Sequence, residues 1–150
     1  QGTPVIVQTK PKSFQLDLDN IKSTLTINTK AIILNSPNNP TGVIYPKEDL
    51  IALADILKVY ENQTGTKIAV ISDEPYNQLN YELPVPNLLN IFDNVIVVNS
   101  FSKSLSLAGG RIGYLIQFFF ILHNKVLILQ GIKTVFMFSF LKFSVAISKP

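Results

Sequence analysis

The sequence contains no cysteine and a single histidine, His123, among its 150 residues. Without cysteine it can form no disulfide framework, no thiolate nucleophile and no zinc site built on thiolates. One histidine also excludes the usual histidine-based metal sites and nucleophilic catalysis of the Ser-His-Asp type. We therefore expect no metal site, and chemistry that uses carboxylate, hydroxyl, amide, lysine and arginine side chains.

Charge is unevenly distributed along the chain. The formal net charge is +3, but all ten acidic residues lie between Asp17 and Asp93, and residues 115–150 combine four lysines and seven of the ten phenylalanines with no acid. The sequence has no cluster of Lys and Arg residues that would indicate a groove for binding nucleic acid, so we expect no nucleic-acid partner. The tail is too interrupted by polar residues for a spanning helix, which needs roughly 18–20 apolar residues, so membrane association is not expected either.

Hydrophobic residues make up 47% of the chain and charged residues 15%, which is typical of a folded protein of one domain. Short apolar runs closed by turn residues predict strands, and leucines at three-to-four spacing predict a helix. The order strand, helix, strand, strand is typical of an α/β fold with a largely parallel sheet. The predicted elements are strands at 2–7, 31–34, 67–72 and 95–99, a short helix capped by Asp17 or Asp19, and a helix from Pro46 to Thr64-Gly65.

Polar clusters follow three of the predicted strands. They occupy residues 35–42, 73–76 and 100–103. In α/β sheets, ligands bind at the carboxyl ends of the strands. We therefore expect these clusters to converge on one ligand site.

Four side chains of this region have groups that could together bind one small molecule. The Asp73 carboxylate can hold a proton on a pyridine nitrogen, and the Tyr76 phenol can donate to an anionic ring oxygen. The amine of Lys103 can form a Schiff base with an aldehyde, and Arg111 can bind a phosphate in a bidentate manner.

Taken singly, these residues have ordinary explanations. The segment Asn38–Gly42 is a good turn sequence, and Asp73 could cap a helix that begins at Glu74 or Pro75. The lysine and the arginine could be solvated surface residues. For the remaining polar and aromatic positions nearby, we expect Glu74 to face solvent or a neighbouring subunit and Tyr81 to be half-buried.

Three motifs in fixed order point to a known family. SPNNPTG spans Ser36–Gly42, SDEPY spans Ser72–Tyr76, and SFSKSLSLAGGRIGY spans Ser100–Tyr114. Together they resemble the class I/II aminotransferases of the fold type I pyridoxal-phosphate enzymes. The resemblance runs from about Gly2 to Tyr114.

The resemblance implies that residues 1–114 form part of the large, mostly parallel-sheet α-β-α domain of such an enzyme. Family members are longer, so we expect this chain to be a central fragment truncated on both sides. Residues 115–150 depart from the family pattern, and no domain is assigned to them. A frameshift, a read-through or a mispredicted gene end would account for that tail.

Roles for individual residues also follow from the resemblance. Asn39 and Tyr76 would bond the phenolic oxygen of the cofactor, with Pro40 fixing the loop through a cis bond, and Asp73 would keep the pyridine nitrogen protonated. Lys103, the catalytic residue, would form the Schiff base and then move a proton between substrate and cofactor. The implied cofactor-binding residues are Asn39, Asp73, Tyr76, Ser100, Ser102, Lys103 and Arg111, of which Ser100, Ser102 and Arg111 would bind the phosphate.

The implied activity is transfer of an amino group between an amino acid and a 2-oxo acid, with pyridoxal 5′-phosphate as cofactor. A homodimer in the cytoplasm is expected for the full-length enzyme. Two alternatives stay open: a lyase of the same fold, and a non-catalytic remnant that serves at most as a binding or scaffold module.

Overall fold

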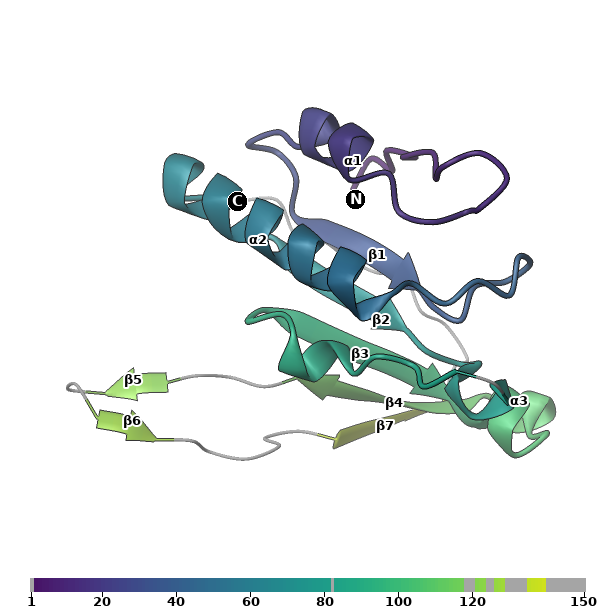
Figure 1. The fold of residues 1–150 in the computed structure, drawn as a ribbon. Helices are drawn as coiled ribbons and strands as arrows, with labels where there is room; N and C mark the ends of the chain where they lie inside the picture. Colours follow the sequence, from purple (N-terminus) through teal and green to yellow (C-terminus); the bar gives the residue numbers. More distant parts are fainter. Residues whose placement is uncertain (1, 82, 118–120, 124–125, 129–134, 140–150) are drawn as a thin grey trace.

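The chain folds around a five-stranded sheet with strand order β1-β2-β3-β4-β7, seen in the computed structural model in Figure 1. The structure describes residues 2–81, 83–117, 121–123, 126–128 and 135–139. Two pairs of neighbouring strands in this sheet, β1 with β2 and β2 with β3, run parallel. Strand β4 runs antiparallel to β3, and β7 runs antiparallel to β4. The strands are β1 (Ala31–Asn35), β2 (Ala69–Asp73), β3 (Val95–Ser100), β4 (Ile112–Gln117) and β7 (Val135–Ser139), and a separate hairpin consists of β5 (Ile121–His123) and β6 (Val126–Ile128).

Two helices cover one face of the sheet, and the sequence encodes where they begin and end. Helix α1 (Leu18–Thr24) begins at Asp17, whose side chain accepts the backbone N–H of Asn20 at 3.0 Å, which confirms the predicted cap. Helix α2 (Lys47–Thr64) ends at Gly65, which adopts a φ of 70° and donates its N–H to the Glu61 carbonyl. Together, these helices and the parallel pairs of neighbouring strands confirm the predicted α/β fold class.

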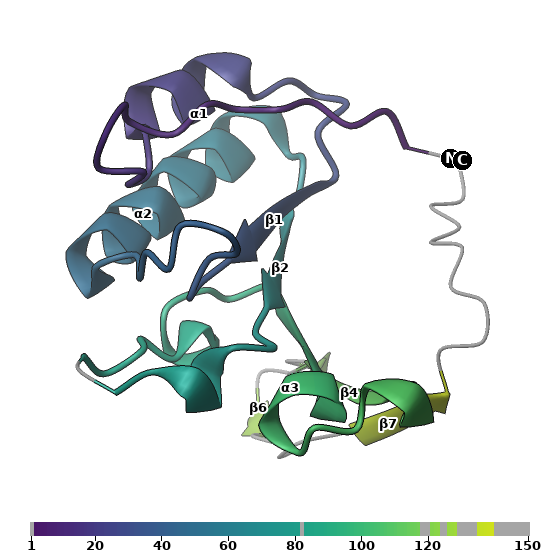
Figure 2. The ribbon, with the colours of Figure 1, turned by 90° about the vertical axis from the view of Figure 1, so that its right-hand side faces the viewer.

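The core lies between α2 and the sheet. Leu50, Leu53 and Leu57 recur at three-to-four spacing on α2 and are almost fully buried. The strand register places Leu34, Ser72 and Val97 side by side on the face beneath this helix, and all of these side chains are buried. Figure 2 shows α1 and α2 together on this side of the sheet.

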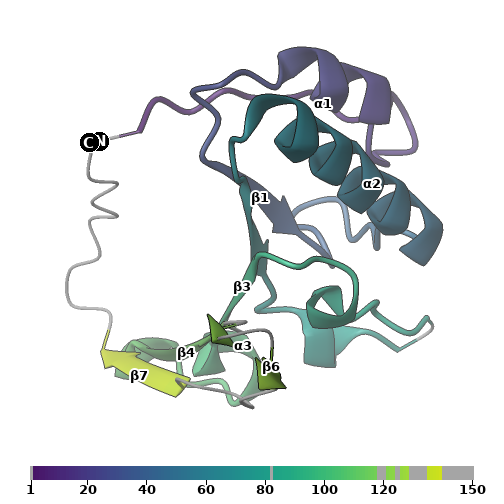
Figure 3. The same ribbon diagram turned by 90° about the vertical axis from the view of Figure 1, so that its left-hand side faces the viewer.

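The opposite face of the sheet carries no helix among the described residues, as Figures 2 and 3 show. The register brings Ile33, Ile71 and Ile96 together on it. Ile33 is 70% exposed, whereas Ile71 and Ile96 are half-buried. We call this surface the open face.

Short helical turns lie in the connections that follow β2 and β3. Two peptide bonds after β1, Ser36–Pro37 and Asn39–Pro40, are cis, so the cis bond expected at Pro40 is present. The turns are η1 (Asn77–Leu79), η2 (Leu88–Asn90), α3 (Phe101–Ser104) and η3 (Ala108–Gly110).

The prediction of a strand at residues 2–7 is wrong. This segment adopts no regular structure, and Val5 and Ile6 are 69% and 83% exposed. A strand needs a neighbour to satisfy its backbone groups, and none of the described strands pairs with this segment. The other predicted strands and helices are present, with ends that differ by one or two residues.

Two adjacent residues of β1 test which face of the sheet supports the fold. Leu34 is 4% exposed and Ile33 is 70% exposed. We expect Leu34→Ala to lower the free energy of unfolding by about 2–5 kcal/mol, because it leaves a cavity under α2. The matched change Ile33→Ala is expected to cost less than about 1 kcal/mol, because its side chain is largely solvated already. Urea unfolding followed by circular dichroism measures both, and equal losses would contradict the assignment of faces.

Candidate functional site

The carboxyl ends of β1, β2 and β3 reach the same edge of the sheet, toward which their arrows point in Figure 1. The register pairs Asn35 with Asp73 and Asp73 with Val98, so the three lie on one face. Ser100 lies two residues beyond Val98 on β3 and thus on that face too. We call this edge, made of residues 35–42, 73–76 and 100–103, the polar rim.

Hydrogen bonds tie the loop after β1 to the loop after β2. Asn39 Nδ2 donates to the Tyr76 hydroxyl oxygen at 3.0 Å. Asn35 Nδ2 donates to the Asp73 carbonyl oxygen at 3.0 Å and to Asp73 Oδ2 at 3.3 Å. Asn35 Oδ1 accepts the Asn39 backbone N–H at 2.9 Å and Asn38 Nδ2 at 3.4 Å. Three of the predicted site residues, Asn39, Asp73 and Tyr76, are thereby connected through Asn35.

The Asp73 carboxylate lies in a partly desolvated position. Burial raises the pKa of Asp73 above its usual range. Its Oδ2 accepts from Asn35, and its Oδ1 has no hydrogen-bond partner within the described part of the chain. Such a carboxylate gains from a cation or an N–H donor placed against it. No α-helix begins at Glu74 or Pro75, so the alternative that Asp73 caps a helix there is not realised.

Lys103 lies on the α3 turn, beside the aromatic ring of Tyr76. Its Nζ is 5.9 Å from the centroid of that ring, within the range of a cation–π interaction. The ring of Phe101 packs against Tyr114 of β4, with centroids 5.6 Å apart and planes inclined by 47°. This contact fixes the turn on β4 and so holds the lysine at the rim, where its side chain is exposed.

The residues predicted to bind a phosphate lie at the end of β3, on α3 and immediately before β4. Ser100 ends β3 and Ser102 lies on α3, next to Lys103. Ser100 pairs with Gly113 of the antiparallel strand β4, two residues after Arg111. Arg111 is exposed, has a φ of 50° and makes no hydrogen bond or ion pair with the other predicted site residues in the described structure. The serines are thus grouped with Lys103, while Arg111 immediately precedes the neighbouring strand β4 and makes no polar contact with them in the described structure.

Glu74 was expected to face solvent or a neighbouring subunit; in the structure it is half-buried and bonds within its own turn, so the first alternative is wrong. Its carboxylate accepts from Ser72 Oγ at 2.7 Å and from Asn77 Nδ2 at 2.5 Å. Ser72 is 2% exposed and lies on the helix-covered side of the sheet, so the turn after Asp73 directs Glu74 back toward the core. Burial raises the pKa of Glu74, the two hydrogen bonds oppose this effect, and the charge of Asp73 adds to it.

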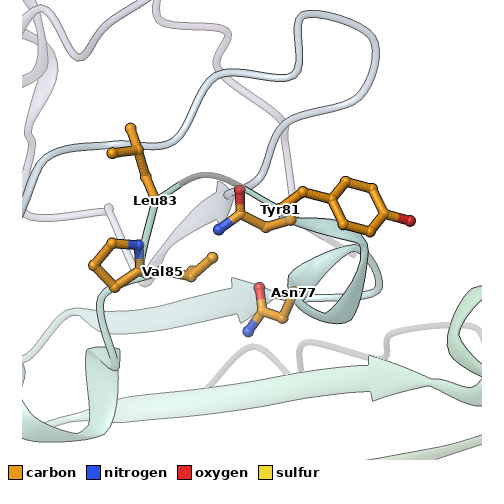
Figure 4. Close-up of a pocket in the computed structure, with 6 residues that line it drawn as sticks. Asn77, Tyr81, Leu83 and Val85 are labelled. Carbon is orange, nitrogen blue, oxygen red and sulfur yellow. The ribbon is translucent and has the colours of Figure 1, made fainter.

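Two hollows lie close to the rim, and neither contains a residue of the predicted cofactor site. One, of about 500 Å³, is drawn in Figure 4 and lies on the connection between β2 and β3. Its lining includes Tyr81, which is 89% exposed and directs its ring outward, so the prediction that Tyr81 is half-buried is wrong. The other, of about 230 Å³, is lined in part by Glu74, Asn77 and Tyr114. Asn39, Lys103 and Arg111 of the predicted site are exposed in the described structure, so these side chains lie on an open rim.

Two further properties concern the described residues only. No group of three or more His, Asp or Glu side chains is arranged there to hold a metal ion. None of the helices in the same ranges combines the length and the apolar character that crossing a membrane requires.

Sequence reasoning missed Asn35, the residue with the most hydrogen bonds at the rim. The available signal was its position: it is the polar residue that ends an apolar strand, as Asp73 ends the next one. Polar residues at corresponding ends of adjacent parallel strands lie side by side once the register is known.

The fold is that of fold type I aminotransferases. A crystal structure of an amino transferase from Eubacterium rectale superposes with a TM-score of 0.70 at 40% sequence identity, covering 73% of this chain and 28% of that one. The crystal structure of the aspartate aminotransferase of Thermotoga maritima superposes with a TM-score of 0.68. The superposition covers 77% of this chain and 30% of the Thermotoga maritima chain.

Sequence comparison gives the family. Residues 1–117 match the sequence model of the family described as aminotransferase class I and II. The chain is 40% identical over 120 residues to the Thermotoga maritima aspartate aminotransferase, and 42% identical over 113 residues to a probable N-acetyl-LL-diaminopimelate aminotransferase of Bacillus subtilis. These alignments cover 77% and 75% of this chain but only 30% and 27% of the relatives. The chain belongs to the aminotransferase class I and II family and spans less than a third of the length of these relatives.

The raised pKa of Glu74 gives a prediction for stability. A carboxyl group with a raised pKa in the folded chain adds stability that is fully present below its unfolded pKa, near 4.5, and is lost as pH rises through the higher folded value. Glu74→Gln removes this titration. We therefore expect the stability of the variant, relative to wild type, to increase as pH rises from about 4 to about 8.

Urea unfolding at each pH measures this difference. Glu48→Gln, on the exposed first turn of α2, controls for the loss of one negative charge. A difference between Glu74→Gln and wild type that stays constant across the pH range would contradict a desolvated carboxyl group at this position.

Proposed function

We propose that this chain is the cofactor-binding central part of an aminotransferase that uses pyridoxal 5′-phosphate to move an amino group between an amino acid and a 2-oxo acid. One observation carries the proposal: Asn39 donates to Tyr76 at 3.0 Å, while the Lys103 amine lies 5.9 Å from the ring of the same tyrosine. Three predicted site residues from three different loops therefore meet at one point. The family of the chain, whose members generally depend on this cofactor, supports the same conclusion.

The donors and acceptors of the rim fit the groups of the cofactor. The Tyr76 oxygen accepts from Asn39, so its hydroxyl hydrogen is free to donate to an anionic oxygen. Asp73 Oδ1, which accepts no hydrogen bond from any described residue, is a partly desolvated acceptor suited to a protonated ring nitrogen. The serine hydroxyls of Ser100 and Ser102 and the guanidinium of Arg111 supply donors suited to a phosphate.

Each residue then has a defined task. When bound, pyridoxal phosphate supplies an electron sink for bonds at the substrate α-carbon. Asp73 holds the proton on the ring nitrogen, and Asn39 and Tyr76 orient the ring through its oxygen. Lys103 Nζ would hold the cofactor at its aldehyde group and, once substrate is bound, would take up and return a proton at the substrate α-carbon. Arg111 and the two serines hold the phosphate.

The substrate is proposed only as a class. Relatives of 40%, 42% and 41% identity are named as aminotransferases for aspartate, N-acetyl-LL-diaminopimelate and histidinol phosphate, so similarity does not single out one amino acid. A homodimer and a cytoplasmic location belong to the proposal for the full-length enzyme.

One observation favours a second candidate function. Asn39, Lys103 and Arg111 are all exposed at an open rim in the described structure. A chain with this surface could bind the cofactor without turnover, as a non-catalytic binding module. The two functions differ in catalysis, which the experiment below separates from cofactor binding.

Lys103→Ala tests the covalent attachment. Incubation of the full chain with pyridoxal 5′-phosphate is expected to give the visible absorption band of an imine, which forms with loss of water. Borohydride is then expected to reduce the C=N bond, abolish the band and leave a phosphopyridoxyl group permanently attached to the peptide that contains Lys103. Lys103→Ala is expected to abolish both signals, because no other amine lies at the rim in the described structure. Mass spectrometry after borohydride treatment identifies the modified lysine.

Lys58→Ala, on the exposed surface of α2, is the matched control and is expected to keep both signals. Labelling of several lysines in proportion to their exposure would contradict a specific site. A specific band without amino-group transfer to any 2-oxo acid would favour the binding module, and a folded chain with no band would overturn the proposed function.

A further inference from the structure

The side-chain amide of Asn35 contacts two of the proposed cofactor-binding residues at once. Its Nδ2 donates to both the carbonyl oxygen and Oδ2 of Asp73, at 3.0 and 3.3 Å. Its Oδ1 accepts the Asn39 backbone N–H at 2.9 Å and Asn38 Nδ2 at 3.4 Å. A side-chain amide has two N–H donors and two acceptor lone pairs, so this network engages both ends of the group.

The network also fixes which end of the amide points to which partner. Rotation of the amide by half a turn would place its oxygen against the carbonyl and the carboxylate of Asp73, which are acceptors, and its NH₂ against the Asn39 N–H, which is a donor. Only the observed orientation satisfies all the partners. The amide of Asn35 therefore holds Asp73 with its NH₂ group and the Asn39 loop with its oxygen.

The position of Asn35 in the sheet makes this contact rigid. Asn35 and Asp73 are register partners at the ends of β1 and β2, held by the parallel ladder of the sheet. Side chains on strands are held in a more precise position than side chains on loops, because the backbone of a strand is fixed by its neighbours. The Asn39 loop, which is exposed, is in contrast held to the sheet through the Asn35 oxygen.

We propose that Asn35 is a positioning residue of the cofactor site: its NH₂ aims the Asp73 carboxylate, and its oxygen fixes the loop that carries Asn39. This inference rests on the proposed function. The hydrogen bond to Oδ2 leaves Oδ1 of Asp73 for the ring nitrogen and stabilises the ionised carboxylate against desolvation. The bond to the Asn39 backbone holds the amide that donates to Tyr76.

Two substitutions separate the two halves of this role. Asn35→Ala removes donor and acceptor together, whereas Asn35→Asp is nearly the same size, keeps an acceptor for the Asn39 N–H and loses the donor to Asp73. Asn35→Ala should raise the pKa of Asp73, because the ionised carboxylate loses a donor, and Asn35→Asp should raise it further, because the new carboxylate also repels the charge of Asp73. Only Asn35→Ala should speed solvent exchange of the Asn39 amide hydrogen, by roughly tenfold.

Nuclear magnetic resonance of the chain without cofactor measures both quantities. The Asp73 carboxyl carbon is titrated in a Glu74→Gln background, because Glu74 is the neighbouring carboxyl whose charge couples to it. Asn28→Ala and Asn28→Asp, in an exposed turn, are matched controls that should leave both signals unchanged. If Asn35→Ala does not fold, Asn35→Leu, which is nearly the same size as asparagine and adds no charge, tests the donor through the pKa of Asp73.

An unchanged Asp73 pKa in the folded variants would overturn the inference, and so would unchanged Asn39 exchange in Asn35→Ala. Where wild type binds pyridoxal 5′-phosphate, Asn35→Ala should weaken that binding by roughly tenfold and leave the affinity for inorganic phosphate unchanged. A wild-type chain that does not bind the cofactor would overturn the proposed function alone, because the pKa and the exchange rate are measured without it.

Discussion

Because β1, β2 and β3 run parallel and in register, their last residues reach one edge of the sheet, and the polar side chains that follow gather there. Asn35 and Asp73 show the effect of this constraint on side chains. They are register partners in the parallel ladder, and the ladder places them close enough for a side-chain hydrogen bond. Asn39 and Tyr76 then meet across the same two loops. Without the parallel register, the three motifs would remain isolated turns.

Local signals account for the parts of the structure that the sequence predicted. A capping aspartate, a C-terminal glycine and leucines at helical spacing locate α1 and α2, because each acts within a few residues. Apolar runs closed by polar clusters locate β1, β2 and β3 for the same reason. The convergence of the clusters then followed from a general property of parallel sheets.

What the sequence did not predict depends on contacts between distant residues. Asn35 acquires its partners only through the register of β1 and β2, which no local pattern encodes. The segment 2–7 has the composition of a strand but pairs with none of the described strands. Tyr81 lies on a connection that does not fold back over the core, so its ring remains in solvent.

Asp73 and Glu74 are adjacent in the sequence, but their carboxylates lie on opposite sides of the sheet and have different partners. Burial raises the pKa of both, but Glu74 turns toward the helix-covered side and receives two hydrogen bonds from Ser72 and Asn77. Asp73 remains on the open face with one of its oxygens unpartnered in the described structure. The first carboxylate stabilises a turn, and the second is left available to a ligand.

The rim and the open face are parts of the same surface. Asn35, Asp73 and Ser100 share the side of the sheet that exposes Ile33, so anything that packs on the apolar strands also borders the polar rim. Covering this face would remove water from Asp73 and strengthen its interaction with a cationic ring nitrogen, because electrostatic attraction grows as the local dielectric constant falls. Burial of apolar surface and tightening of the site are therefore coupled in this fold.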